Sequence, residues 1–270
     1  MIDYHIHTEL CGHASGHVED YIEKALAIGL TEIGFADHFP VLYQPKFSLP
    51  IRSITMSEDK IPAYLRLIET AKSKSKNLSV RTGFEVDYYI HDNLFFNKYL
   101  NLLSHLDYII GSVHFLDEWG FDQPEFKDRI NGKSVTGLWR DYLLQIRNMV
   151  NEHGNDIDII GHLDLPKKLD WPVPDEFQEE FRSLIRLIRG KELVVEINTS
   201  GYDKPVKEFY PSPAVLTLLK DEKVEITLGS DSHKPDEVGR YFRPARDLLK
   251  KTGFNKVIKF DQHKKDFIYL

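Results

Sequence analysis

Two histidines near the start of the chain have the spacing of a metal site. His5 and His7 lie in the stretch DYHIHTELCGH, residues 3–13, which also contains His13. Alternate residues of a β-strand point to the same face, so both imidazoles can bind one ion at the end of a strand. With 12 histidines in 270 residues, chance alone gives roughly half of one such pair. The pair is therefore weak evidence by itself.

The ends of five later β-type runs carry side chains of the same kind. They are His38 in FADHF, Glu85 in GFEVD, His114 in GSVHF, His162 in IIGHLD, and Asp231 with His233 in LGSDSH. The carboxyl ends of parallel strands in a barrel share one rim, and barrel enzymes hold their active sites there. Together with His5, His7 and His13 they make nine candidate metal ligands. Core packing does not explain this pattern.

Nine ligands are too many for one ion, which takes about four to six. Three divalent ions that share a bridging carboxylate would use all of them. Two ions about 3.5–4 Å apart can share a hydroxide and stabilise both sides of an in-line displacement at phosphorus. The ligands therefore favour hydrolysis of a phosphate ester, and zinc, manganese and iron all accept them.

The elements that must position these ligands alternate along the chain. Short β-type runs cover residues 1–7, 31–38, 79–87, 106–114, 156–162, 192–198 and 224–231, with a doubtful eighth at 255–260. Amphipathic helical patterns cover 17–29, 57–76, 137–154, 175–190 and 212–223. This βα order predicts a closed α/β barrel of parallel strands rather than an open sheet. The irregular stretches 39–56 and 115–134 are expected to be loops on one face of it.

Composition and charge exclude several classes of protein. The chain has 29% charged residues and a net charge of −7, and without a run of basic residues it is not expected to bind nucleic acid. No apolar run approaches the roughly 20 residues of a membrane helix, and no signal segment precedes the first strand. The single cysteine, Cys11, favours a reducing compartment. We expect a cytoplasmic enzyme that forms one domain over residues 1–270.

Other polar residues carry weaker hypotheses. Cations in loops or at element ends that could hold a substrate phosphate are Arg52, Lys167, Lys168, Lys204, Lys234 and Arg243. Among these six, Arg52, Lys168, Lys204 and Lys234 are the substrate-binding candidates. Asp3 and Asp164 have the spacing of carboxylates that orient ligand imidazoles. Cys11 is interpreted as a small buried residue without a chemical role, and His91, His105, His153 and His263 as surface residues.

Taken in order, these motifs resemble the polymerase and histidinol phosphatase (PHP) superfamily. The motifs are DYHIHT with CGH, FADHF, GFEVDYY, GSVHF, GHLDL, EINTSG and GSDSHKP, and they run from residue 3 to about residue 240. They are specific as an ordered set, although each is weak alone. More narrowly, the chain is similar to the branch that hydrolyses L-histidinol phosphate in histidine biosynthesis.

The resemblance implies a distorted (β/α)7 barrel with three divalent ions, zinc, manganese or iron, at the C-terminal rim of the strands. The last strand would then lie outside the barrel. The implied ligands are His5, His7, Glu85 and Asp231 for the first ion, Glu85, His114 and His162 for the second, and His13, His38 and His233 for the third. A cation near the phosphate is expected after EINTSG, where this chain has Tyr202, Asp203 and Lys204. The role of Lys204 therefore stays open.

The mechanism implied is attack of a hydroxide on phosphorus at ions bridged by Glu85. Asp231, His233 or a nearby water would give a proton to the departing alkoxide. Two other functions stay open. A related phosphoesterase could act on nucleotides or a DNA 3′ end, against which the acidic charge argues. A non-catalytic metal-stabilised module could support a partner protein, against which the complete ligand set argues.

Overall fold

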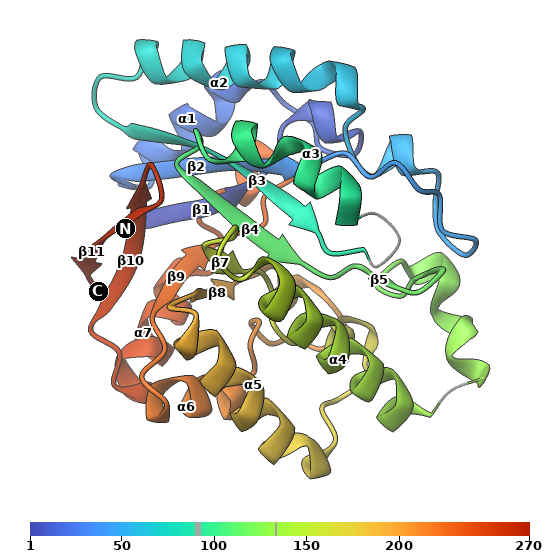
Figure 1. The fold of residues 1–270 in the computed structure, drawn as a ribbon. Coiled ribbons are helices and arrows are strands. Elements are labelled where there is room, and N and C mark those ends of the chain that lie inside the picture. The colour runs from blue at the N-terminus through green and yellow to red at the C-terminus, as the bar shows by residue number, and fades with distance from the viewer. Residues whose placement is uncertain (90–92, 133) are drawn as a thin grey trace.

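Parallel strands form a nearly closed barrel at the centre of the molecule (Figure 1). The computed structural model describes residues 1–89, 93–132 and 134–270. The barrel strands are β1 (Ile2–Ile6), β2 (Glu32–His38), β3 (Ser79–Asp87), β4 (Tyr108–Ser112), β7 (Ile159–Ile160), β8 (Val194–Asn198) and β9 (Ile226–Gly229). They follow the order β1-β2-β3-β4-β7-β8-β9 with parallel pairing throughout. The predicted barrel is confirmed.

The first and last strands of this order meet through a short parallel contact. Ile6 pairs with Ser232. The backbone N–H of His7 donates to Ser232 O at 2.9 Å, and that of Ser232 donates to His5 O at 3.0 Å. As a result, the residues that follow β9 lie directly beside His5 and His7.

Helices cover the outside of the barrel (Figure 1). They are α1 (Val18–Ala27), α2 (Ile61–Lys74), α3 (Asn93–Leu103), α4 (Val135–His153), α5 (Gln178–Gly190), α6 (Pro213–Asp221) and α7 (Phe242–Thr252). All five amphipathic patterns form helices. In α6, the Ser212 side chain accepts a hydrogen bond from Val215 N and Pro213 occupies the first turn, as the sequence predicts. The sequence analysis did not predict α3 and α7.

Short elements connect the strands and helices. The 3₁₀ helices are η1 (Glu9–Cys11), η2 (Ile51–Ser53), η3 (Glu58–Lys60), η4 (Pro124–Gly132), η5 (Leu165–Leu169), η6 (Asp175–Phe177), η7 (Ser200–Asp203) and η8 (Pro235–Glu237). The stretches 39–56 and 115–134 contain η2, η4 and a small hairpin of β5 (Phe115–Leu116) and β6 (Trp119–Gly120). Both stretches line the same cavity, so they do lie on one face of the barrel.

The C-terminal hairpin lies outside the barrel, as the resemblance implied. It consists of β10 (Lys256–Asp261) and β11 (Lys264–Tyr269), which pair antiparallel. Phe260 N donates to the Tyr4 hydroxyl at 2.8 Å, and the Thr227 hydroxyl donates to Ile258 O at 2.8 Å. These bonds attach the hairpin to β1 and β9 at residues before the ligand positions. Within the described residues, no helix combines the length and apolarity needed to cross a membrane.

Candidate metal centre

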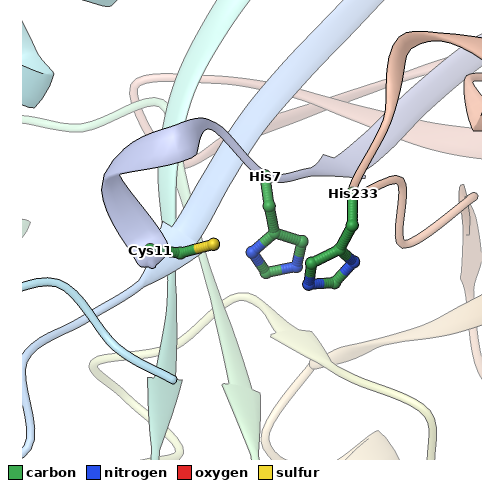
Figure 2. A group of neighbouring side chains, drawn as sticks. All are labelled: His7, Cys11 and His233. Atoms are coloured by element: carbon green, nitrogen blue, oxygen red, sulfur yellow. The ribbon is translucent and has the colours of Figure 1, made fainter. Parts of the chain in front are cut away.

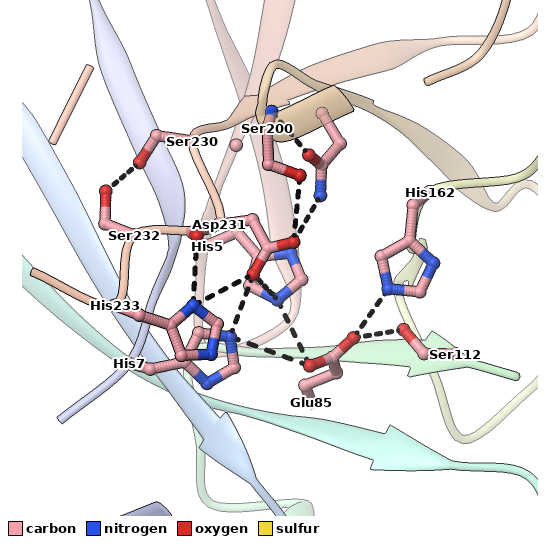
Figure 3. A network of polar contacts seen from close by, with 12 residues as sticks. His5, His7, Glu85, Ser112, His162, Ser200, Ser230, Asp231, Ser232 and His233 are labelled. Atoms are coloured by element: carbon pink, nitrogen blue, oxygen red, sulfur yellow. Dashed lines mark hydrogen bonds and ion pairs between the residues drawn. The ribbon is translucent and has the colours of Figure 1, made fainter. Parts of the chain in front are cut away.

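All nine candidate ligands meet at the C-terminal ends of the barrel strands. His5 lies in β1, His38 is the last residue of β2, and Glu85 lies near the end of β3. The others follow strand ends directly or within a few residues, except His13, which comes from the loop after η1. Figure 3 shows His5, His7, Glu85, His162, Asp231 and His233 converging on one another. The parallel barrel therefore gathers residues that are far apart in sequence, such as His13 and His233, which are 220 positions apart.

Glu85 lies between two groups of imidazoles (Figure 3). Its Oε2 is 3.2 Å from His5 Nε2 and 2.9 Å from His38 Nδ1. Its Oε1 is 3.0 Å from His162 Nε2 and 3.7 Å from His114 Nε2, and it also accepts a hydrogen bond from the Ser112 hydroxyl at 2.6 Å. Each carboxylate oxygen thus faces a different group, which is the arrangement of a bridging ligand.

Asp231 completes the group around His5 and His7. Its Oδ1 is 3.4 Å from His7 Nε2 and 3.9 Å from His5 Nε2. Its Oδ2 accepts hydrogen bonds from Asn198 Nδ2 at 3.3 Å and the Ser200 hydroxyl at 3.2 Å. One oxygen is therefore held by the protein while the other faces the imidazoles.

The donor atoms fit divalent ions. His5, His7 and Asp231 form one compact set of potential ligand atoms, and His13, His38 and His233 form another, with all atoms of a set within 4.8 Å of one another. Five buried ring nitrogens make no hydrogen bond of acceptable geometry with the described residues, although some lie near a carboxylate, namely His5 Nε2, His7 Nδ1 and Nε2, His38 Nδ1 and His162 Nδ1. Buried polar atoms are almost always satisfied, so these nitrogens indicate ligands for a bound group.

The carboxylates of the site favour a positive charge beside them. Burial would lower the pKa of His5, but Glu196, Glu85 and Asp231 outweigh it and raise that pKa well above its ordinary value. Burial would raise the pKa of Glu85, but His5, His38 and His114 hold it well below its ordinary value. Glu85 therefore stays ionised in a buried pocket, where it stabilises positive charge.

Two histidines of the third set, His13 and His233, are held neutral. Burial, then repulsion from His38 and His233, lowers the pKa of His13 to about 3. Burial lowers the pKa of His233 to about 4, although Asp231 opposes this shift. Burial, followed by the neighbouring His233 and His38, also lowers the pKa of His7 well below its ordinary value. A neutral imidazole has the free lone pair that a metal ion needs.

Two carboxylates that orient ligand imidazoles were missed in the sequence. Glu196 Oε1 lies 2.6 Å from His5 Nδ1, and Asp87 Oδ1 lies 2.8 Å from His114 Nδ1. Such contacts fix the ring and direct its other nitrogen at the ion. The signal was present, because Glu196 interrupts the apolar run LVVEIN and Asp87 shares a strand face with Glu85.

Asp3 and Asp164, which have the spacing of carboxylates that orient imidazoles, bind other groups. Asp3 accepts hydrogen bonds from Ser230 N at 2.9 Å and Gly239 N at 2.9 Å. Asp164 accepts from Ser212 N at 2.7 Å and pairs with Lys167. These buried carboxylates therefore bind backbone and ammonium groups rather than the ring nitrogens of the candidate ligands.

Cys11 lies close to the third ligand set (Figure 2). It is fully buried, and its sulfur points toward the ring of His7, with His233 on the far side of that ring. Its Sγ is 3.6 Å from His13 Nδ1. Burial, followed by the nearby Asp37 carboxylate, raises the pKa of the thiol to about 12. These features agree with the interpretation of Cys11 as a small buried residue.

A cavity of about 360 Å³ opens above the ligands. Lys168 and Lys204 line it. The Lys168 ammonium is 2.7 Å from Asp122 Oδ2, whereas the Lys204 ammonium has no ion pair with any of the described residues. Arg240, which the sequence analysis did not select, lines the cavity as well.

The other cations selected from the sequence lie elsewhere. Arg52, Lys234 and Arg243 are exposed and do not line the cavity. Lys167 is buried, and its Nζ donates to Phe209 O at 2.6 Å. The structure therefore brings only Lys168 and Lys204 of the six to the ligands.

The four histidines that were expected at the surface lie in different environments. His105 is exposed as expected, and His91 lies outside the described residues. The expectation of a surface position was wrong for His153, which is buried. His263 is partly exposed, and its ring lies 2.8 Å from Asp158.

Comparisons with known proteins cover nearly the whole chain. A family model described as the PHP domain matches residues 3–200. The probable histidinol-phosphatase of Deinococcus radiodurans is 36% identical over 255 residues, 94% of each chain. The histidinol-phosphatase of Bacillus subtilis is 30% identical over 88% of this chain and 95% of its own length. The crystal structure of histidinol phosphate phosphatase from Lactococcus lactis, complexed with zinc, L-histidinol and phosphate, matches with a TM-score of 0.83, 26% identity and 98% coverage of both chains.

Proposed function

The chain belongs to the PHP domain family, and from this premise we propose that it hydrolyses L-histidinol phosphate to L-histidinol and phosphate. It is a phosphoric monoester hydrolase, as its histidinol-phosphatase relatives are. The observation that carries the proposal is the position of Glu85 between two groups of imidazoles at the base of a cavity. The zinc in the Lactococcus lactis structure supports the use of divalent metal ions.

We further propose three ions, zinc, manganese or iron, held by three ligand sets. The sets are His5, His7, Glu85 and Asp231, then Glu85, His114 and His162, then His13, His38 and His233. The sharing of Glu85 follows from its two oxygens, which face different imidazoles. Bound divalent ions supply Lewis acidity at phosphoryl oxygens and a nucleophilic hydroxide at neutral pH.

Lys168 and Lys204 are our proposed contacts for the phosphate. Both line the cavity, and an ammonium group is a strong donor to phosphate oxygens. Asp122 fixes the position of Lys168, while Lys204 is free of ion pairs to the described residues. Asp231 and His233 also line the cavity. Our candidates for giving a proton to the departing alkoxide remain these two residues or a nearby water molecule.

Two loops wall the cavity and would separate the substrate from bulk water. Phe47 N donates to Glu118 O at 2.8 Å, and Gly120 N donates to Phe47 O at 2.9 Å. Leu49 N donates to Gln123 Oε1 at 2.7 Å. These bonds join the stretches 39–56 and 115–134, and Leu49 lines the cavity. The organic part of the substrate would lie against this joined wall.

The test compares phosphate release from histidinol phosphate, simple nucleotides and an aryl phosphate, with metal content measured on the same sample. We expect the highest kcat/KM for histidinol phosphate. A rate no better than that for the aryl ester would overturn the substrate, and faster nucleotide hydrolysis would favour the nucleotide alternative. Glu85→Ala and Asp231→Ala should abolish turnover while the far-UV circular dichroism stays unchanged. Normal activity in either variant would contradict the proposed site.

We also propose the domain organisation, the location and the biological role of the protein. We propose one domain over residues 1–270, supported by the attachment of the C-terminal hairpin to β1 and β9. We also propose a cytoplasmic enzyme of histidine biosynthesis with a small-molecule substrate and no nucleic-acid or membrane partner. Fractionation of cells that express the protein, and growth of a strain lacking histidinol phosphatase on medium without histidine, test these two expectations.

A further inference from the structure

Asp231 has an unusual backbone conformation for a ligand residue. Its φ is 52°, in the left-handed region that side chains other than glycine rarely adopt. Such a conformation persists only where surrounding contacts impose it, and it is often found at functional sites. From this backbone, the carboxylate reaches His5 and His7. Another group must therefore hold the backbone of Asp231 in this left-handed conformation.

The Arg240 guanidinium binds the backbone on both sides of the Asp231 α-carbon. Its Nε donates to Ser230 O at 3.0 Å, and its Nη2 donates to Asp231 O at 2.9 Å. These two carbonyls belong to the peptide groups before and after the residue, so their directions depend on its φ and ψ. A planar guanidinium that binds both fixes their relative orientation.

Arg240 is itself fixed by two carboxylates. Its Nη1 is 3.2 Å from Asp203 Oδ2 and 3.5 Å from Glu237 Oε1. Its side chain is only 13% exposed. Glu237 also accepts a hydrogen bond from His233 N at 2.8 Å. The segment around η8 thus holds the turn that carries both Asp231 and His233.

A buried carboxylate supports the same turn from the barrel side. Asp3 accepts from Ser230 N and from the Ser230 hydroxyl, the latter at 2.5 Å, and it also accepts from Gly239 N. It therefore connects the start of the turn to the residue before Arg240. Figure 3 shows the Ser230 and Ser232 hydroxyls hydrogen-bonded to each other and directed away from the Asp231 carboxylate.

We propose that Arg240 is a positioning residue for metal binding, which holds Asp231 in its left-handed conformation and so directs the carboxylate at the ion shared with His5 and His7. This inference rests on the proposed function, because it takes Asp231 as a metal ligand. Arg240 lines the cavity, so a direct contact with phosphate is the competing role. Against that role, all three guanidinium nitrogens already have protein acceptors.

The experiment uses the purified, metal-loaded protein. Metal affinity is measured by competition with a chelator, and stability by thermal unfolding of the metal-loaded protein and of the metal-depleted protein. We expect Arg240→Gln to weaken affinity by roughly 10- to 100-fold, as is usual for partners that orient a ligand. Arg240→Lys should lose less, since one ammonium can still bind one carbonyl. Lys250→Gln removes an exposed charge from α7, the helix that follows Arg240, and should leave affinity unchanged.

Several outcomes would overturn the inference. Wild-type metal affinity in Arg240→Gln with a raised KM would make Arg240 a phosphate contact. Lower stability of the metal-depleted protein with unchanged affinity would make it only a structural residue. If Arg240→Gln does not fold, Asp203→Asn removes a charge that orients Arg240, and wild-type affinity in both Asp203→Asn and Arg240→Lys would overturn the inference.

An Asp231→Asn variant separates this inference from the proposed function. Unchanged metal content in Asp231→Asn would remove the ligand assignment and with it the inference. Loss of metal in Asp231→Asn with full affinity in Arg240→Gln would overturn the inference alone. Weaker metal binding in both Asp231→Asn and Arg240→Gln supports the ligand assignment of Asp231 as well as the positioning role of Arg240.

Discussion

Glu196 Oε1 lies 2.6 Å from His5 Nδ1, and both side chains are fully or almost fully buried. The other oxygen, Oε2, accepts hydrogen bonds from His162 N at 3.0 Å and from Asn198 Nδ2 at 3.1 Å. Glu196 therefore fixes the ring of one proposed ligand and the backbone of another. Because these two ligands belong to different ion sets, one carboxylate sets the spacing between the sets.

Because of these contacts, we expect replacement of Glu196 to have a large effect on metal binding. Glu196→Ala should lower metal affinity by roughly 10- to 100-fold, because the His5 ring loses its partner. Glu196→Gln should lose less, since an amide oxygen can still accept from Nδ1. Chelator competition measures both, with Glu225→Gln as the control, because Glu225 belongs to a surface ion pair. Equal effects of the alanine and glutamine variants would show that charge rather than orientation matters.

The convergence of the candidate ligands could be predicted because the fold is built from local patterns. His38 and Glu85 end runs of strand character, and parallel strands necessarily bring such ends together. The lengths of the strands were less predictable. The run 156–162 forms only the short β7, Ile159–Ile160, because an apolar run reports burial and not the number of residues that pair with β4 and β8.

The missed residues depend on contacts that are distant in sequence. Nothing local shows that Glu196 faces His5, 191 positions away, or that Arg240 reaches the carbonyl of Asp231. For α7 a local signal existed, since Phe242, Ala245 and Leu249 have helical spacing and are buried. Pro244 in its first turn is compatible with a helix.

Gly83 allows close approach of β4 to β3. A Cβ added there would lie 2.7 Å from two ring carbons of Tyr108, which is fully buried. Gly83→Ala should therefore lower the free energy of unfolding by about 1–3 kcal/mol, as overpacking of a core does. Gly190→Ala is the control, because a Cβ there meets no atom within 4 Å. Urea denaturation measures both, and equal stabilities would show that Tyr108 can move aside.

His263 predicts a pH dependence of stability. Its Nδ1 is 2.8 Å from Asp158, whose hydrogen bond and charge raise the pKa of His263 in the folded protein, although burial opposes this. The folded state therefore holds this proton more tightly than the unfolded state. The stabilisation is fully present below the unfolded pKa of about 6.5 and is lost as pH rises through the folded pKa.

The variant His263→Asn isolates this contribution. Asparagine tolerates the positive φ of 62° at this position. The difference in unfolding free energy between wild type and variant, measured in urea, should be larger at about pH 6 than at about pH 9. A difference that does not change with pH would show that the ion pair with Asp158 makes no contribution.

Lys204 and Lys234 provide a matched pair for locating the phosphate. Lys204 lines the cavity, and burial, followed by repulsion from Lys168, lowers its pKa, whereas Lys234 is exposed and outside the cavity lining. An ammonium bond to a charged group contributes about 1.5–3 kcal/mol, so Lys204→Met should lower kcat/KM for histidinol phosphate at least tenfold. Inhibition by inorganic phosphate should weaken in parallel, because phosphate shares the contact. Lys234→Met should change neither quantity, and the reverse result would place the phosphate on the outer side of the turn that carries His233.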